Sequence, residues 1–185
     1  MSLENGILGF LSMKPQSGDD LKKLFNYSAV YFWPADQAQI YRTLKKLVED
    51  GSAELTKQEQ DKTVERKVYA ITEKRRHVLH DWIANPEGSD FISHLPFLLK
   101  LFFWSALSQE EQLAFLDTQL KVNNELFQNL KDNYKANGNS FAVIVGLDEG
   151  DRRLNSATYT HRWGILRGEA YGQLLEEILA EILAK

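Results

Sequence analysis

Residues 34–51 constrain the fold of this chain more than any other stretch. Pro34 disfavours helix at the residue before it, and Asp36 is a good N-cap. Gly51 is a common residue at a helix C-terminus, so the sequence predicts a helix over residues 36–50. One face of this helix is apolar, with Ile40, Leu44, Leu47 and Val48. The other face is polar and mainly basic, with Gln39, Arg42, Lys45, Lys46 and Glu49.

Two shorter helices and a hairpin surround this helix. Apolar periodicity predicts a helix over residues 3–13, and Ser17 begins a second helix that buries Leu21, Leu24 and Phe25. Two strands are expected over residues 52–57 and 63–71, with a polar, charged turn between them. A fourth helix begins at Thr72, with an expected inner face of Val78, Leu79, Trp82 and Ile83. This order is typical of a winged helix-turn-helix, which places one helix in the DNA major groove.

The polar face of the third helix carries residue types that can bind DNA. Gln can pair with adenine and Arg with guanine, whereas Lys mostly contacts phosphates. The predicted DNA-binding residues are Ser17, Lys22, Gln37, Gln39, Tyr41, Arg42, Lys45, Lys46, Arg66 and Lys67, with Lys62 as a further candidate in the wing. Two alternatives stay open: a solvated amphipathic helix, and a charged hairpin edge that resists aggregation.

The charge distribution permits DNA binding without predicting it. The net charge is -4, but residues 1–84 hold 13 Lys/Arg and 12 Asp/Glu, so the acid is concentrated in the second half. The chain has no cysteine, which excludes disulfides and thiolate sites and favours a cytoplasmic location. No apolar run approaches the roughly 20 residues of a membrane span, and the start lacks the pattern of a secretion signal.

Residues 85–89 form the clearest linker, so we expect a DNA-binding domain over 1–84, a linker over 85–90 and a helical dimerisation domain over 91–185. The expected fold is mostly α (α+β), with a two-stranded wing and antiparallel long helices. Ser108 and Glu111 match a capping box, and Asn123 interrupts an apolar stripe where it could fix the register. A last helix is expected over residues 156–184. The predicted dimerisation residues are Leu113, Leu116, Leu120, Phe127, Leu130, Trp163, Leu166, Leu174 and Ile178.

Tryptophan and histidine suggest other sites. Trp33, Trp104 and Trp163 could line a pocket for an aromatic effector, although each is also a candidate for a core or interface position. His77 and His80 have a spacing that could chelate a metal on one helix face, but no second cluster lies nearby in sequence. We therefore predict no catalytic residue, no metal and no cofactor.

Four segments carry a familiar pattern: residues 7–21, residues 32–35 with 39–44, residues 67–74, and residues 164–171. Together they resemble the PadR family of bacterial transcriptional regulators, and the last resembles the virulence-activator type of C-terminal domain. The resemblance implies a homodimer, held by its C-terminal helices, that represses or sometimes activates a nearby promoter. In some members, phenolic acids or other small hydrophobic compounds release the DNA.

The chain departs from this family pattern in two places that affect DNA contact. Arg42 stands where the family usually has Pro, which adds a cation to the DNA-facing helix. The wing turn lacks the Gly-Arg-Pro type of sequence. Two other functions therefore remain open, a winged helix that binds proteins instead of DNA, and a small metal-dependent enzyme that uses His77 and His80.

Overall fold

The computed structural model describes residues 3–29, 32–61, 64–88, 95–136, 147–148 and 150–184, apart from the side chains of residues 57–65 and 133–136. The chain divides into two compact units. One comprises Met1–Asp90 with Asn139–Leu154, and the other Phe91–Gly138 with Asn155–Lys185. Among the helices within these ranges, none has the length and apolar character needed to cross a membrane.

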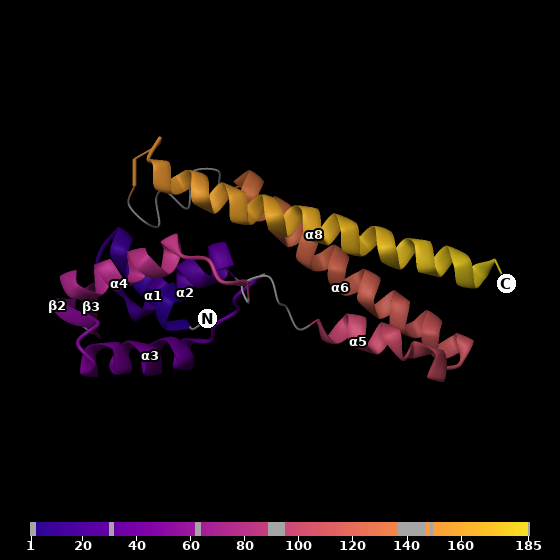
Figure 1. Cartoon of the computed structure of the whole chain (residues 1–185), viewed down its shortest axis with the longest axis horizontal. Helices are drawn as coiled ribbons and strands as arrows, with labels where there is room; N and C mark the ends of the chain where they lie inside the picture. The colour runs from indigo at the N-terminus through magenta and orange to yellow at the C-terminus, as the bar shows by residue number, and fades with distance from the viewer. Residues whose placement is uncertain are drawn as a thin grey trace. The chain divides into compact units, whose positions relative to one another are not determined.

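Four helices and a small sheet form the N-terminal unit (Figure 1). The helices are α1 (Leu3–Met13), α2 (Gly18–Leu24), α3 (Gln37–Glu49) and α4 (Glu73–Ala84), and a π-helical turn, η1 (Phe25–Ala29), follows α2. Their apolar faces form one core, which includes Ile7, Leu8, Leu11, Leu21, Ile40, Leu44 and Leu47, all fully buried. The helix predicted over residues 36–50 is therefore confirmed, and so is its buried face, except that Val48 is exposed.

Capping boxes begin α2 and α3. At α2, the Ser17 hydroxyl accepts from the Asp20 N–H, and the Asp20 carboxylate accepts from the Ser17 N–H. At α3, Asp36 and Gln39 make the equivalent pair of bonds. Each box satisfies backbone donors that the first helical turn leaves without a partner. The predicted caps at Ser17 and Asp36 are confirmed.

The sheet has three antiparallel strands in the order β1-β3-β2. They are β1 (Gln16–Ser17), β2 (Ala53–Asp61) and β3 (Val64–Ile71), and Ala53 lies opposite Ile71. The hairpin is confirmed, but β2 is longer than the predicted 52–57, and β1 was missed. β1 is only two residues long, too short to show a periodic pattern in the sequence. It is a strand because Gln16 and Ser17 pair with Tyr69 and Val68 of β3. Lys62, predicted in the wing, lies outside the described residues.

The inner face predicted for α4 is wrong in part. Leu79 is buried in the core, whereas Val78, Trp82 and Ile83 are 45%, 41% and 65% exposed. Within the unit, α4 packs mainly on α1, and one helix covers only a narrow stripe of its neighbour. Apolar periodicity identified the residues but could not show that the unit supplies too little surface to cover them.

Helices make up the described part of the C-terminal unit (Figure 1). They are α5 (Pro96–Phe102), a short 3-10 turn η3 (Trp104–Ala106), and the long helices α6 (Gln109–Ala136) and α8 (Arg152–Leu183). The capping box predicted at Ser108 and Glu111 is confirmed. α6 and α8 run antiparallel, because Gln109 contacts Ile182 whereas Asn123 contacts Gly168.

The predicted seam on α6 packs within one chain. Leu116, Leu175 and Ile182 form the buried core between α6 and α8, and Leu113, Leu120 and Ile178 pack against it, partly buried. Leu116 is 0% exposed in the single chain, so it is not available to a partner in this arrangement. Asn123 fixes the register as expected, since its Nδ2 donates to the Gly168 carbonyl at 3.2 Å.

Two glycines of α8 allow α6 to approach closely. A Cβ on Gly168 would lie 2.7 Å from the Phe127 ring, and one on Gly172 would lie 3.1 Å from Asn123 Nδ2. Atoms at these separations must move, and overpacking of this kind costs about 1–3 kcal/mol. The glycines thus place the backbone of α8 beside the seam.

Gly168→Ala is expected to lower the melting temperature of the helices, followed by circular dichroism. The contact with Phe127 should outweigh the gain of about 1 kcal/mol in helix propensity. Gly9→Ala, in α1, is the matched control, because a Cβ there meets no atom within 4 Å. That variant should be neutral or stabilised. Equal stabilisation by both changes would contradict the close approach of α6 and α8.

Candidate nucleic-acid interface

The burial of one face of α3 fixes the exposure of the other. Ile40, Leu44 and Leu47 are fully buried, so the helix cannot rotate without exposing them. Six of the predicted DNA-binding side chains consequently lie at the surface: Gln37, Gln39, Tyr41, Arg42, Lys45 and Lys46. The structure brings these six together on one helix.

On the side of α3 that faces α2, Asp19 is the shared partner. Its Oδ1 accepts one hydrogen bond from Gln37 Nε2 and one from the Tyr41 hydroxyl, each 3.0 Å long. A Cβ on Gly18 would lie 2.6 Å from the Tyr41 ring, so only glycine allows this approach of α2. Burial, together with the bond to Asp19, raises the pKa of Tyr41 above its usual value. Tyr41 is therefore a neutral hydroxyl at physiological pH.

On the side that faces α1, Lys46 forms an ion pair with Glu4. Arg42 and Lys45 lie between the two sides. Arg42 Nε donates to the Ala38 carbonyl at 3.3 Å, and Lys45 Nζ lies 3.8 Å from a Glu49 oxygen. Exposed contacts of this kind contribute little energy, so both cations can exchange them for DNA.

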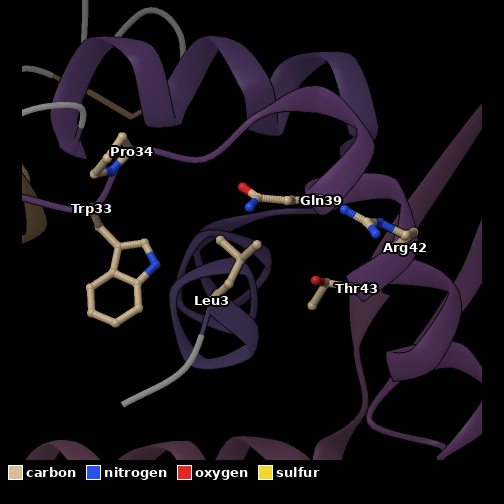
Figure 2. Close-up of a pocket in the computed structure, with 6 residues that line it drawn as sticks. All are labelled: Leu3, Trp33, Pro34, Gln39, Arg42 and Thr43. Atoms are coloured by element: carbon tan, nitrogen blue, oxygen red, sulfur yellow. The ribbon is translucent and has the colours of Figure 1, made fainter.

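A pocket of about 250 Å³ lies beside the first turns of α3. Figure 2 shows the residues that line it: Leu3, Trp33, Pro34, Gln39, Arg42 and Thr43. Of the three tryptophans predicted for an effector pocket, Trp33 lines this one. Trp104 packs on the core of the C-terminal unit, and Trp163 is 58% exposed on α8.

The hairpin contributes Arg66 and Lys67, both exposed on β3. The Arg66 guanidinium donates to Asp20 Oδ2 at 2.5 Å. Burial raises the pKa of Asp20, but the hydrogen bonds from Ser17 and the contact with Arg66 more than offset this, and the net pKa is lowered. Asp20 is therefore ionised at neutral pH and links β3 to α2.

Two other predicted DNA-binding residues have structural contacts. Ser17 is buried, and its hydroxyl donates to Asp20 Oδ2 at 2.7 Å. Lys22 Nζ donates to the Ala35 carbonyl at 2.8 Å and so ties α2 to the segment before α3. Both residues have a role in the fold of the unit, whether or not they also contact a ligand.

Sequence reasoning missed the acids that surround this surface. Glu4, Asp19 and Asp20 each hold a polar or basic residue of α3 or β3. The available signal was the pair Asp19-Asp20 directly after Ser17. A cap needs one carboxylate, so the second one was available for another contact.

The His77 and His80 pair has ordinary surface contacts. His77 lies 3.8 Å from a Glu73 oxygen, and His80 lies 3.5 Å from an Asp81 oxygen; all four side chains are exposed. Within the described ranges, no three His, Asp or Glu side chains are grouped in a way that could hold a metal ion.

Residues 7–81 match the Transcriptional regulator PadR-like family. Among curated proteins, the chain is similar to the Negative transcriptional regulator PadR of Bacillus subtilis (strain 168). The two are 31% identical over 133 residues, which span 72% of this chain and 73% of that protein.

Solved structures of relatives match almost the whole chain. Bacillus subtilis PadR in complex with operator DNA has a TM-score of 0.80 and 27% identity, with 97% of this chain and 98% of that chain covered. The same protein in complex with p-coumaric acid has a TM-score of 0.73 and 26% identity, and the match covers 97% of this chain and 98% of that chain. The Vibrio cholerae virulence activator AphA has a TM-score of 0.75 and 29% identity, and the match covers 99% of each chain. The predicted fold class is thereby confirmed, and the chain belongs to the PadR-like family of transcriptional regulators.

Proposed function

We propose that this protein is a DNA-binding transcriptional repressor that acts as a homodimer. The observation that carries the proposal is the exposed polar surface of α3, held outward by three buried residues, Ile40, Leu44 and Leu47, and followed directly by the β2–β3 hairpin. The similarity over nearly the full length to a relative bound to operator DNA supports the same use of this surface. The relative's description as a negative regulator supports repression.

In this proposal, residues 1–84 bind DNA, residues 85–90 connect the parts, and residues 91–185 dimerise. Arg42 and Lys45 lie on the outermost row of α3 and would enter the major groove, where Arg can read guanine. Arg66 and Lys67 of the hairpin would contact phosphates. The remaining candidates on α3, Gln37, Gln39, Tyr41 and Lys46, would flank these contacts.

The test is a binding series with the full chain against the duplex upstream of its own gene and a random duplex, at several salt concentrations. We expect preference for the upstream duplex and an affinity that falls steeply with salt, because each phosphate contact releases counterions. Salt-sensitive binding without preference would place the operator elsewhere. A purified dimer that binds neither duplex at any salt would contradict DNA binding and favour a protein-interaction module.

Exposed apolar residues in the C-terminal unit support the homodimer. Tyr159, Trp163 and Leu166 follow one face of α8 at four- and three-residue steps, and each is at least half exposed. Phe102, the last residue of α5, and Phe103, which follows it, are exposed as well. Apolar surface of this extent in a single chain is typical of an interface, and a second copy of the chain would cover it.

Replacing Trp163 and Leu166 together by glutamate is expected to give a monomer with its helices intact. Two buried charges per protomer would oppose association without touching the core between α6 and α8. Sedimentation measures the mass, and circular dichroism the helix content. The same change at Thr158 and Thr160, exposed polar positions of α8 outside that face, is the control and should stay dimeric. A dimer that survives the first pair would place the interface on another face.

An aromatic acid is the class of effector that we propose for release from DNA, since a relative has been solved with p-coumaric acid. We propose no catalytic step and no cofactor, and a cytoplasmic location where promoter DNA is accessible.

A further inference from the structure

Asp19 controls two side chains of the DNA-facing surface from outside α3. Gln37 and Tyr41 lie one helical turn apart, and a single oxygen of Asp19 accepts a hydrogen bond from each at 3.0 Å. Exposed Gln and Tyr side chains otherwise sample several rotamers, and immobilising each one on binding costs about 0.5–1.5 kcal/mol. A shared partner in the free protein reduces that cost.

Asp19 is itself held in place. The capping box between Ser17 and Asp20 fixes the backbone on both sides of it. Gly18 brings this turn so close to the Tyr41 ring that a Cβ would lie 2.6 Å from two of the ring carbons. The carboxylate therefore projects from a rigid turn towards α3.

The contact also decides how the Gln37 amide faces outward. An ionised carboxylate only accepts hydrogen bonds, so the amide nitrogen must point to Asp19. The amide oxygen and the second amide hydrogen remain for DNA. Adenine presents the complementary pair in the major groove, the N6 donor beside the N7 acceptor, whereas cytosine presents a donor alone.

The charge of Asp19 has a second consequence. An acid at a DNA-facing surface repels phosphates, which lowers affinity for any duplex irrespective of sequence. It therefore weakens binding overall, and the sequence preference comes from the side chains that Asp19 orients.

We infer that Asp19 is a positioning residue of this interface, which orients Gln37 and Tyr41 towards an A·T base pair and, through its charge, lowers the affinity for every duplex alike. The assignment rests on the DNA-binding function proposed above. In contrast to Arg42 or Lys45, Asp19 need not touch the DNA to set the sequence preference.

The experiment uses the full chain and an operator selected by the wild-type protein from randomised duplexes, in which each base pair is then replaced in turn. We expect one A·T position where replacement weakens wild-type binding about tenfold, the loss of one base contact. Gln37→Ala and Asp19→Ala should both reduce that penalty to about threefold or less, and the double variant should go no further, because the residues act as one unit.

Asp19→Asn separates geometry from charge. The Asn oxygen can still accept from Gln37 and Tyr41, so the A·T preference should persist, while binding to the operator and to random duplex should both tighten about twofold to fivefold because a repulsive charge is gone. Asp19→Asn also keeps the inference testable if Asp19→Ala folds poorly.

Three results would overturn the assignment: an unchanged base profile in Asp19→Ala, effects of Asp19→Ala and Gln37→Ala at different base pairs, or loss of the A·T preference in Asp19→Asn. Each of these leaves the wild type a DNA-binding protein. A wild type that selects no duplex and shows no salt-sensitive binding would instead refute the proposed function, and this inference with it.

Discussion

Leu116→Asn is expected to destabilise the C-terminal unit by about 3–5 kcal/mol, because it leaves a cavity and buries an amide without partners. Leu116 is fully buried between α6 and α8, against Leu175 and Ile182. Circular dichroism should show a loss of helix at temperatures where the wild type is folded.

Lys121→Asn is the control for this change, because it places the same residue on the exposed side of α6. It should cost no more than the few tenths of a kcal/mol that separate Asn from Lys in helix propensity. If Leu116→Asn melts like Lys121→Asn, Leu116 is not in a core. A stable, fully helical monomer would place Leu116 in the interface between two copies, where periodicity alone had also put it.

Arg42→Ala is expected to weaken binding to the selected operator about tenfold to a hundredfold, the range for loss of a bidentate Arg–guanine contact. Arg42 is exposed on α3, and its hydrogen bond to the Ala38 carbonyl, 3.3 Å long, does not hold it away from DNA. Competition binding at fixed salt against random duplex measures the effect. Affinity for the random duplex should fall much less, since Arg42 is assigned to a base.

Lys23→Ala controls for the general loss of a positive charge, because Lys23 is exposed on α2 and not on α3. It should reduce binding to both duplexes slightly and equally. If Arg42→Ala behaves in the same way, Arg42 contacts a phosphate or nothing, and the base contact belongs to another residue of α3. The two variants should fold like the wild type, because neither side chain is buried.

Local signals explain what could be predicted well. The starts of α2, α3 and α6 depend on pairs three residues apart, at Ser17, Asp36 and Ser108, so the chemistry of each cap is visible in a short window. The buried row of α3 follows from the period of the helix. The order of the elements then follows from the caps and the hairpin, and with it the fold of the N-terminal unit.

Contacts between distant residues explain what was missed. β1 is a strand only because Gln16 and Ser17 pair with β3, some fifty residues later. Asp19 has its role only because α2 packs beside α3 and brings it to Gln37 and Tyr41. Residues 16–20 offer a spare carboxylate, but taken alone they do not identify the distant residues that these contacts join.

The sequence by itself determined where the helices begin, which of their faces are apolar, and that a polar, basic surface of α3 precedes a hairpin. These properties depend on backbone chemistry within one or two turns. Only the tertiary structure decided what covers each apolar face: Leu116 is covered by the chain's own α8, whereas Val78 and Trp163 remain exposed. The hydrophobic effect drives burial without specifying a partner, so the same stripe fits a core or an interface until packing selects one.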